Sequence, residues 1–269
     1  MIRKPVVAGQ FYSSSKTALE KDIGAILPKR NTQEDAIGVV SPHAGYMYSG
    51  PVAARVLGSI IPKPTYVIIG PNHTGLGMEF SLDTSQAWQT PLGEVLVNTE
   101  LAAAILKNSK HIERDHQAHA FEHSIEVQLP FLQSIHNDFT FVPIIVTHAD
   151  IEVYKAIGRE IAHAITSSSL SGKVTIIASS DMTHYEPHDK AKDKDSIAIK
   201  AILRLDEDEL YRVVRTFDIS MCGYAPTCIM LACAKSLGAK SARLVDYKTS
   251  GDMTGDYSAV VGYAGIVVL

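Results

Sequence analysis

Three histidines of this 269-residue chain stand just after short apolar runs. His43 lies in the motif SPHAG, His73 in GPNHTG and His184 in SSDMTH. Neutral imidazole is the commonest metal ligand in proteins, and imidazole also works as a general base near neutral pH. A catalytic metal needs about three protein ligands and an open coordination position. His43 and His73 therefore predict two ligands of a metal site.

The third ligand has two chemical alternatives. A carboxylate would complete the set of two histidines and one carboxylate that is typical of non-haem iron enzymes, whereas a thiolate would suit iron, copper or zinc. Cys222, in MCGYAPT, precedes a helical stretch, where a helix N-terminus can lower the pKa of a thiol. The alternative for Cys222 is a small buried apolar side chain. Asp181 and His184, three residues apart, are expected to act as a supporting acid and a general base.

A second group of titratable residues occupies RDHQAHAFEHSIEVQLPFL, residues 114–132. His116, His119 and His123 would lie near one face of a continuous helix, which would suit a second metal cluster. The HExxH motif of metalloproteases is absent. The preferred interpretation is that Glu122 and His123 border the first site, while His116 and His119 are exposed.

Nucleotide-binding and hydrolase motifs do not occur in the sequence. GxxxxGK[ST] is absent, and no GxGxxG follows an apolar run, so we expect no nucleotide cofactor. GxSxG is also absent, which argues against the nucleophile elbow of the α/β-hydrolases. The chemistry of the chain is therefore expected at the histidines.

Predicted strands and helices alternate along the chain, and they would position the histidines and Cys222. Apolar runs without strict alternation predict strands that are buried on both faces. These runs are 36–40, 66–70, 139–146, 174–179, 242–247 and 259–268. Helical stretches are expected at 16–27, 51–60, 100–106, 124–135, 151–166, 195–205, 207–216 and 226–237. Residues 76–97 do not follow this alternation of strands and helices. They predict short strands and turns that form an antiparallel excursion or an edge of the sheet.

Strands that alternate with helices predict an α/β fold, here a single layered αβα domain over residues 1–269 with a mostly parallel central sheet. Ligands of such sheets bind beyond the carboxyl ends of the strands. His43, His73 and His184 each follow a predicted strand. They would converge on one place if those strands are neighbours.

Composition excludes several classes of protein. Hydrophobic residues make up 46% of the chain and charged residues 20%, which is typical of a globular protein. The net charge of −4 gives no basic excess for nucleic acid. Three cysteines do not predict a disulfide framework. No apolar run reaches membrane-spanning length and the N-terminus lacks the apolar core of a signal peptide, so we expect a cytoplasmic protein without membrane contact.

Several motifs in order resemble one known family, the Memo family, named for a mediator of ErbB2-driven cell motility. They are AGQFY (8–12), PHAGYMYSG (42–50), GPNHTG (70–75), WQTPLGEV (88–95), EHSIEVQLPFL (122–132), SSDMTH (179–184) and MCGYAPT (221–227). The resemblance runs nearly end to end. It implies partners of the AMMECR type and of the radical-SAM type, because prokaryotic relatives are associated with them under the label AmmeMemoRadiSam system protein B.

The resemblance also implies a fold similar to that of the class III, LigB-like extradiol dioxygenases. Those enzymes hold Fe²⁺ with two histidines and a glutamate, and they cleave catechol rings with dioxygen. By motif, His43 and His73 match the two histidines, and Cys222 stands near the third position. Asp181 and His184 match the acid and the base beside the pocket.

The pocket residues implied by the resemblance are Phe11, in GQFY, whose aromatic ring would form a wall, and Glu122 and His123, which belong to a family motif. Three functions follow as hypotheses. The first is a redox enzyme with a mononuclear His-His-Cys site for Fe²⁺, or alternatively Cu⁺ or Zn²⁺, and an unnamed substrate. The second is a non-catalytic protein that binds a small molecule or peptide on a former dioxygenase scaffold. The third is a zinc-type hydrolase.

Overall fold

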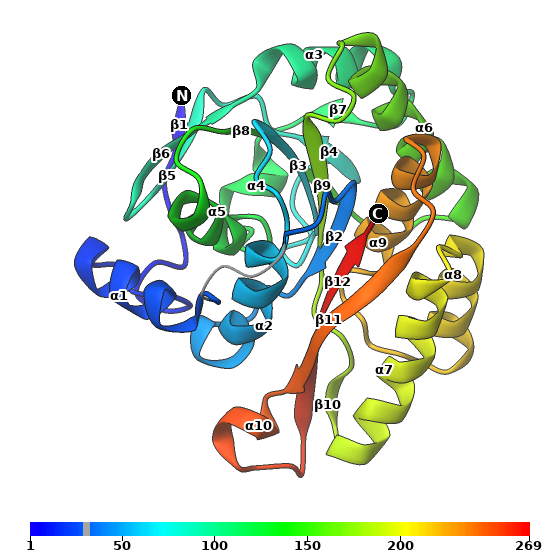
Figure 1. Ribbon diagram of the computed structural model, residues 1–269. Coiled ribbons are helices and arrows are strands. Elements are labelled where there is room, and N and C mark those ends of the chain that lie inside the picture. Colours follow the sequence, from blue (N-terminus) through cyan, green and yellow to red (C-terminus); the bar gives the residue numbers. More distant parts are fainter. Residues whose placement is uncertain (29–32) are drawn as a thin grey trace.

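The computed structural model describes residues 1–28 and 33–269. In this part of the chain, twelve strands form one sheet, and helices cover both of its faces (Figure 1). The strands are β1 (Ile2–Arg3), β2 (Gly38–Ser41), β3 (Thr65–Pro71), β4 (Phe80–Leu82), β5 (Ala87–Thr90), β6 (Gly93–Val97), β7 (Glu113–Arg114), β8 (Thr140–Val146), β9 (Val174–Ser179), β10 (His184–Glu186), β11 (Ala242–Thr249) and β12 (Val260–Val268).

The helices are α1 (Lys16–Ile26), α2 (Tyr46–Gly58), α3 (Thr99–Asn108), α4 (Gln117–Ala120), α5 (Leu129–Ile135), α6 (Ile151–Ser167), α7 (His188–Leu203), α8 (Glu207–Thr216), α9 (Tyr224–Ser236) and α10 (Gly251–Thr254), with a 3₁₀ turn η1 (Glu126–Gln128) before α5. None of the helices in the described ranges is long and apolar enough to cross a membrane.

The main path of the sheet runs β1-β5-β6-β8-β3-β9-β2-β12-β10. Strands β6, β8, β3, β9 and β2 pair in parallel, whereas β12 is antiparallel to β2. The α/β fold with a mostly parallel sheet is therefore confirmed. Residues 76–97 supply β4, which is antiparallel to β8, and the β5–β6 hairpin, as the sequence predicts.

Alternate residues of the central strands enter two apolar cores. Val40 and Val67 pack on the face covered by α3, α6 and α9, while Val39 and Ile68 pack on the face covered by α1, α2 and α5. Figure 1 shows these two groups of helices on opposite sides of the sheet. Because the central strands are buried on both faces, they appear in the sequence as continuous apolar runs. The two cores also fix the carboxyl ends of the parallel strands at one edge of the sheet.

Three helices differ clearly from the expected bounds. The helix expected at 195–205 is α7, which already begins at His188. The helix expected at 51–60 begins at Tyr46, because Gly45 is its N-cap, so Pro51 lies inside α2. The backbone N–H of Tyr46 donates to the carbonyl of Phe11, which joins the start of α2 to the N-terminal segment. The helix expected at 124–135 is instead the turn η1 followed by α5.

Candidate metal centre

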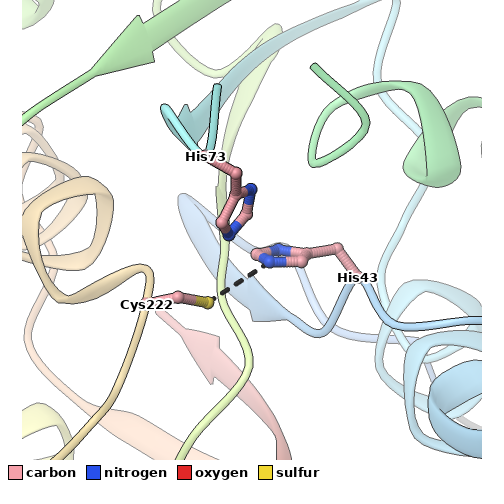
Figure 2. A group of neighbouring side chains, drawn as sticks. All are labelled: His43, His73 and Cys222. Atoms are coloured by element: carbon pink, nitrogen blue, oxygen red, sulfur yellow. Dashed lines mark hydrogen bonds between the residues drawn. The ribbon is translucent and has the colours of Figure 1, made fainter. Parts of the chain in front are cut away.

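His43 and His73 meet at the carboxyl edge of the sheet. Strand β9 lies between β2 and β3, so the loops that follow β2 and β3 flank it, and the ring centroids of His43 and His73 are 5.2 Å apart. Cys222 reaches the same place from the loop between α8 and α9 (Figure 2). One potential ligand atom from each of the three residues lies within 4.8 Å of the others. The strands are thus neighbours, as the convergence of the histidines requires.

The protonation of His43 follows from its hydrogen bonds. Its Nδ1 lies 2.9 Å from the Ser179 hydroxyl oxygen, and that hydroxyl donates its own proton to the carbonyl of Ser124 at 2.6 Å. A hydroxyl has one proton to give, so His43 Nδ1 must be the donor to Ser179. The Nε2 atom of the neutral His43 ring therefore carries no proton. Burial, with the nearby His73 and His123, lowers the pKa of His43 well below its usual range and keeps the ring neutral.

Glu122 sets the protonation of His73 in the same way. One carboxylate oxygen accepts from His73 Nδ1 at 2.9 Å, and the other accepts from the His73 backbone N–H at 2.6 Å. A carboxylate that holds Nδ1–H leaves Nε2 available to a metal. Burial alone would raise the pKa of Glu122, but the hydrogen bond and charge of His73 lower it to about 2. Burial lowers the pKa of His73, but its hydrogen bond and charge interaction with Glu122 reverse this and leave that pKa raised.

Cys222 Sγ lies 3.2 Å from His43 Nε2. Because the His43 Nε2 has no proton, the thiol donates to it. Two ligands at right angles, with metal–nitrogen and metal–sulfur bonds of usual length, stand about 3.1 Å apart. The observed separation therefore suits two ligands of one metal ion. Burial raises the pKa of the Cys222 thiol well above its usual range, so metal binding would release this proton.

The loop that carries Cys222 packs tightly against the end of β9. A Cβ at Gly223 would lie 2.3 Å from both the Ser179 carbonyl oxygen and the Ser180 Cβ, so only glycine fits there. The Gly223 backbone N–H donates to the Ser180 hydroxyl at 3.1 Å, and the Asp181 backbone N–H donates to Cys222 Sγ at 3.3 Å. These contacts fix the sulfur against the strand end.

His184 faces the site from β10. Its Nδ1–H donates to the Ser220 carbonyl at 2.8 Å, which leaves Nε2 as the basic nitrogen. The register of β10 against β12 shifts at this point, and Tyr185 has a φ of 58°, in the left-handed region. Bulges of this kind redirect side chains beside functional sites. The backbone of Ser220, rather than Asp181, holds His184 in place.

Asp181 supports the loop that carries His43. Its Oδ1 accepts from the His43 backbone N–H at 2.7 Å, and the side chain is almost fully buried. Burial raises the pKa of Asp181 to about 6. The Asp181 carboxyl group therefore lies beside the candidate ligand His43 and holds its backbone in place.

A cavity of about 470 Å³ opens on the His43 side of the centre. Its walls include the aromatic rings of Phe11, Tyr48, Tyr185 and Tyr263, together with His123 and His184. Neither lysine nor arginine lines it among the described residues. We call it the aromatic cavity. A cavity of this size and lining suits a small aromatic molecule.

His123 joins this cavity, but its two neighbours in the histidine-rich segment do not. The His123 ring stacks on His73 at 4.7 Å and contacts Phe11 at the same distance. His116, His119 and His123 do not share one face of a continuous helix, because the helix in this segment, α4, spans only Gln117–Ala120. The expected exposure of His119 is also wrong, since its side chain is fully buried. His116 is half-buried and bonds to Asp83 at 3.1 Å.

A buried ion pair behind the site was not anticipated from the sequence. Arg3 donates to Glu126 at 2.6 Å and to the backbone carbonyls of Glu122 and His119 at 2.6 and 2.9 Å. Glu126 also accepts from the Tyr12 hydroxyl at 2.6 Å. The pair ties the N-terminal segment to the segment that holds His73. The only sequence signal is the four-residue spacing of Glu122 and Glu126.

Fold and site together define an α/β protein with a candidate His-His-Cys metal centre at the carboxyl edge of its sheet. A family profile described as Memo-like protein matches residues 3–267. The chain belongs to the Memo family. A MEMO1 family protein from Methanopyrus kandleri is 44% identical over 99% of both chains, and one from Methanococcoides burtonii is 45% identical over 99% of this chain and 100% of its own.

A solved structure shares the fold. An uncharacterized protein from Escherichia coli K12 matches with a TM-score of 0.57 and 11% identity, over 86% of this chain and 98% of its own. At so low an identity the match extends to the fold alone.

Proposed function

We propose that this chain is a non-haem iron oxidoreductase of the dioxygenase-like kind, in which His43, His73 and Cys222 hold Fe²⁺ and the substrate is a hydroxylated aromatic molecule. The observation that carries the proposal is the convergence of three candidate ligand atoms within 4.8 Å of one another, from two histidines whose Nδ1 atoms are held by Ser179 and Glu122 and from the Cys222 thiol. Three protein ligands leave coordination positions open.

The donor set fits the ion. Imidazole suits iron, and thiolate ligands also hold iron in proteins. Bound Fe²⁺ would supply the one-electron chemistry that lets dioxygen react with an organic molecule. The resemblance to LigB-like dioxygenases supports the same assignment, with Cys222 where those enzymes have glutamate. A softer ligand at this position is expected to shift the redox behaviour of the ion.

The substrate would occupy the aromatic cavity. Aromatic walls pack against an aromatic ring, and a described lining without lysine or arginine favours a substrate without a carboxylate or phosphate. His184 Nε2 is placed to accept the proton of a substrate hydroxyl, because its Nδ1–H is held by the Ser220 carbonyl. His123, on the same cavity, would pack against the ring.

The test is dioxygen consumption by protein loaded with Fe²⁺ under anaerobic conditions and then mixed with a panel of catechols. Wild-type protein is expected to consume dioxygen with at least one of them. His184→Gln should retain iron and slow turnover by about 10²–10⁴-fold. His163→Gln is the matched control, because His163 is an exposed residue of α6.

Two outcomes would replace the proposal. Iron retained without any dioxygen consumption would favour a non-catalytic ligand-binding protein. Hydrolysis of phosphoesters or amides by zinc-loaded protein, with no dioxygen use by the iron form, would favour a zinc-type hydrolase.

A further inference from the structure

A second cavity lies on the other side of the candidate metal centre. It has a volume of about 490 Å³ and is bordered by Cys222 and His73. Among the described residues, His73 alone lines both this cavity and the aromatic cavity. The candidate ligand His73 therefore lies where the two cavities border each other. We call the second one the Cys222 cavity.

The floor of the Cys222 cavity is apolar. It includes Val146, Ile219, Met221 and Ala225, whose exposed fractions are 1%, 4%, 2% and 4%. Their place in the lining together with this low exposure puts these side chains at the bottom of the cavity. A ligand that reaches them would make van der Waals contacts with apolar side chains.

The polar groups of this cavity carry no fixed charge. Lysine, arginine, aspartate and glutamate are all absent from its described lining. At one side, His148 Nδ1 and the Tyr224 hydroxyl lie 2.9 Å apart and form a hydrogen-bonded pair. Ionic ligands would lose their hydration here without a partner of opposite charge, which is costly. The His148–Tyr224 pair offers a hydrogen-bonding group instead.

We propose that the Cys222 cavity is a second ligand site, which binds an uncharged, mainly apolar small molecule with one hydrogen-bonding group. The apolar part lies on Val146, Met221 and Ala225, and the polar group meets the His148–Tyr224 pair. The volume is within the range of small-molecule pockets. The inference goes beyond the proposed function, because it needs neither a metal nor turnover.

The experiment uses metal-free, full-length protein with ¹³C-methyl-labelled methionine. Met221 is the reporter, and its signal is assigned by comparison with Met221→Leu. The probes are 2-naphthalenemethanol, which is neutral, and 2-naphthoate, which has a similar size and a negative charge. The neutral probe is expected to shift the Met221 signal saturably, with an apparent Kd at least tenfold lower than that of naphthoate.

Three variants locate the binding. Ala225→Phe fills the floor of the Cys222 cavity, and Thr147→Trp narrows its rim; each should weaken the neutral probe at least tenfold. Thr147 is only partly buried, so its variant tests the site if Ala225→Phe does not fold. Ala44→Phe, which narrows the aromatic cavity, should leave the Met221 titration unchanged. The proposal is overturned by an absent or non-saturable shift, by equal affinity for naphthoate, or by unchanged binding in the folded filling variants.

Discussion

Glu122 holds His73 at two points, through the backbone N–H at 2.6 Å and through Nδ1 at 2.9 Å. The same carboxylate accepts from the backbone N–H groups of His123 and Ser124, each at 2.8 Å. All of its contacts come from N–H donors. Glu122 is thus a support for a candidate ligand, although it lies close enough to His73 and His123 to be mistaken for one.

Glu122→Gln should weaken metal binding by about 10–100-fold, because an amide group would turn one acceptor oxygen into a donor that faces other donors. Isothermal titration of metal-free protein with Zn²⁺ measures the change. Glu94→Gln serves as the control, since Glu94 is an exposed residue of β6. Equal affinity in wild-type protein and Glu122→Gln would mean that the carboxylate does not position His73.

Gly223→Ala should destabilise the protein by about 1–3 kcal/mol, because its Cβ would overlap Ser179 and Ser180. Gly24→Ala, within α1, has no atom within 4 Å of the added Cβ and should be neutral or slightly stabilising. Urea denaturation gives both free energies of unfolding. If the two variants are equally stable, the loop of Cys222 does not need its close approach to β9.

Arg3→Met should cost about 3–5 kcal/mol of folding free energy, because it leaves the buried Glu126 without its cation. The double variant Arg3→Met/Glu126→Gln should recover part of this loss, since the uncompensated charge is gone. Thermal and urea unfolding of the single and double variants form the test. A loss below about 1 kcal/mol in Arg3→Met would contradict the importance of this pair.

His119 should make stability depend on pH. Burial lowers its pKa to about 4, and its buried Nδ1 has no hydrogen-bond partner among the described residues. Between pH 4 and 6.5 the unfolded chain therefore binds more protons at this residue than the folded chain. The free energy of unfolding should fall as the pH drops through this window, by up to about 3 kcal/mol from His119.

The measurement for His119 is urea denaturation at several pH values between 4 and 7. His119→Gln removes the titrating group, so its stability should change less steeply with pH than that of wild-type protein. Parallel curves for the two proteins would assign the pH dependence to other groups.

The strand-end histidines could be predicted because parallel strands end at one edge, so residues after them share a location. The order β3-β9-β2 that brings His43 and His73 together could not be predicted from periodicity. The sequence predicts His184 near the site, but its partner is the backbone carbonyl of Ser220, 36 residues away, which leaves no pattern in the sequence. The exposure predicted for His119 is wrong because its ring packs against Trp88, a contact that the local sequence does not encode.

The charged run HDKAKDKDS, residues 188–196, predicts a solvated start of a helix, and this expectation holds only in part. It begins α7, yet Asp195 within it is fully buried, where it accepts from the Tyr247 hydroxyl at 2.7 Å and the Thr183 backbone N–H at 2.9 Å. A carboxylate is buried in a core only where hydrogen-bond donors of this kind compensate for its lost hydration. One donor lies on β11 and the other in the loop before β10, so the burial of Asp195 depends on tertiary contacts.

The most direct test of the candidate metal centre is the metal content of tag-free protein loaded anaerobically with Fe²⁺, Zn²⁺ or Cu⁺ in separate samples. Wild-type protein and the control His163→Ala should each hold about one iron per chain. His43→Ala, His73→Ala and Cys222→Ser should each lose most of it. Wild-type protein that retains no metal, or three variants that retain as much as wild type, would contradict a His-His-Cys site.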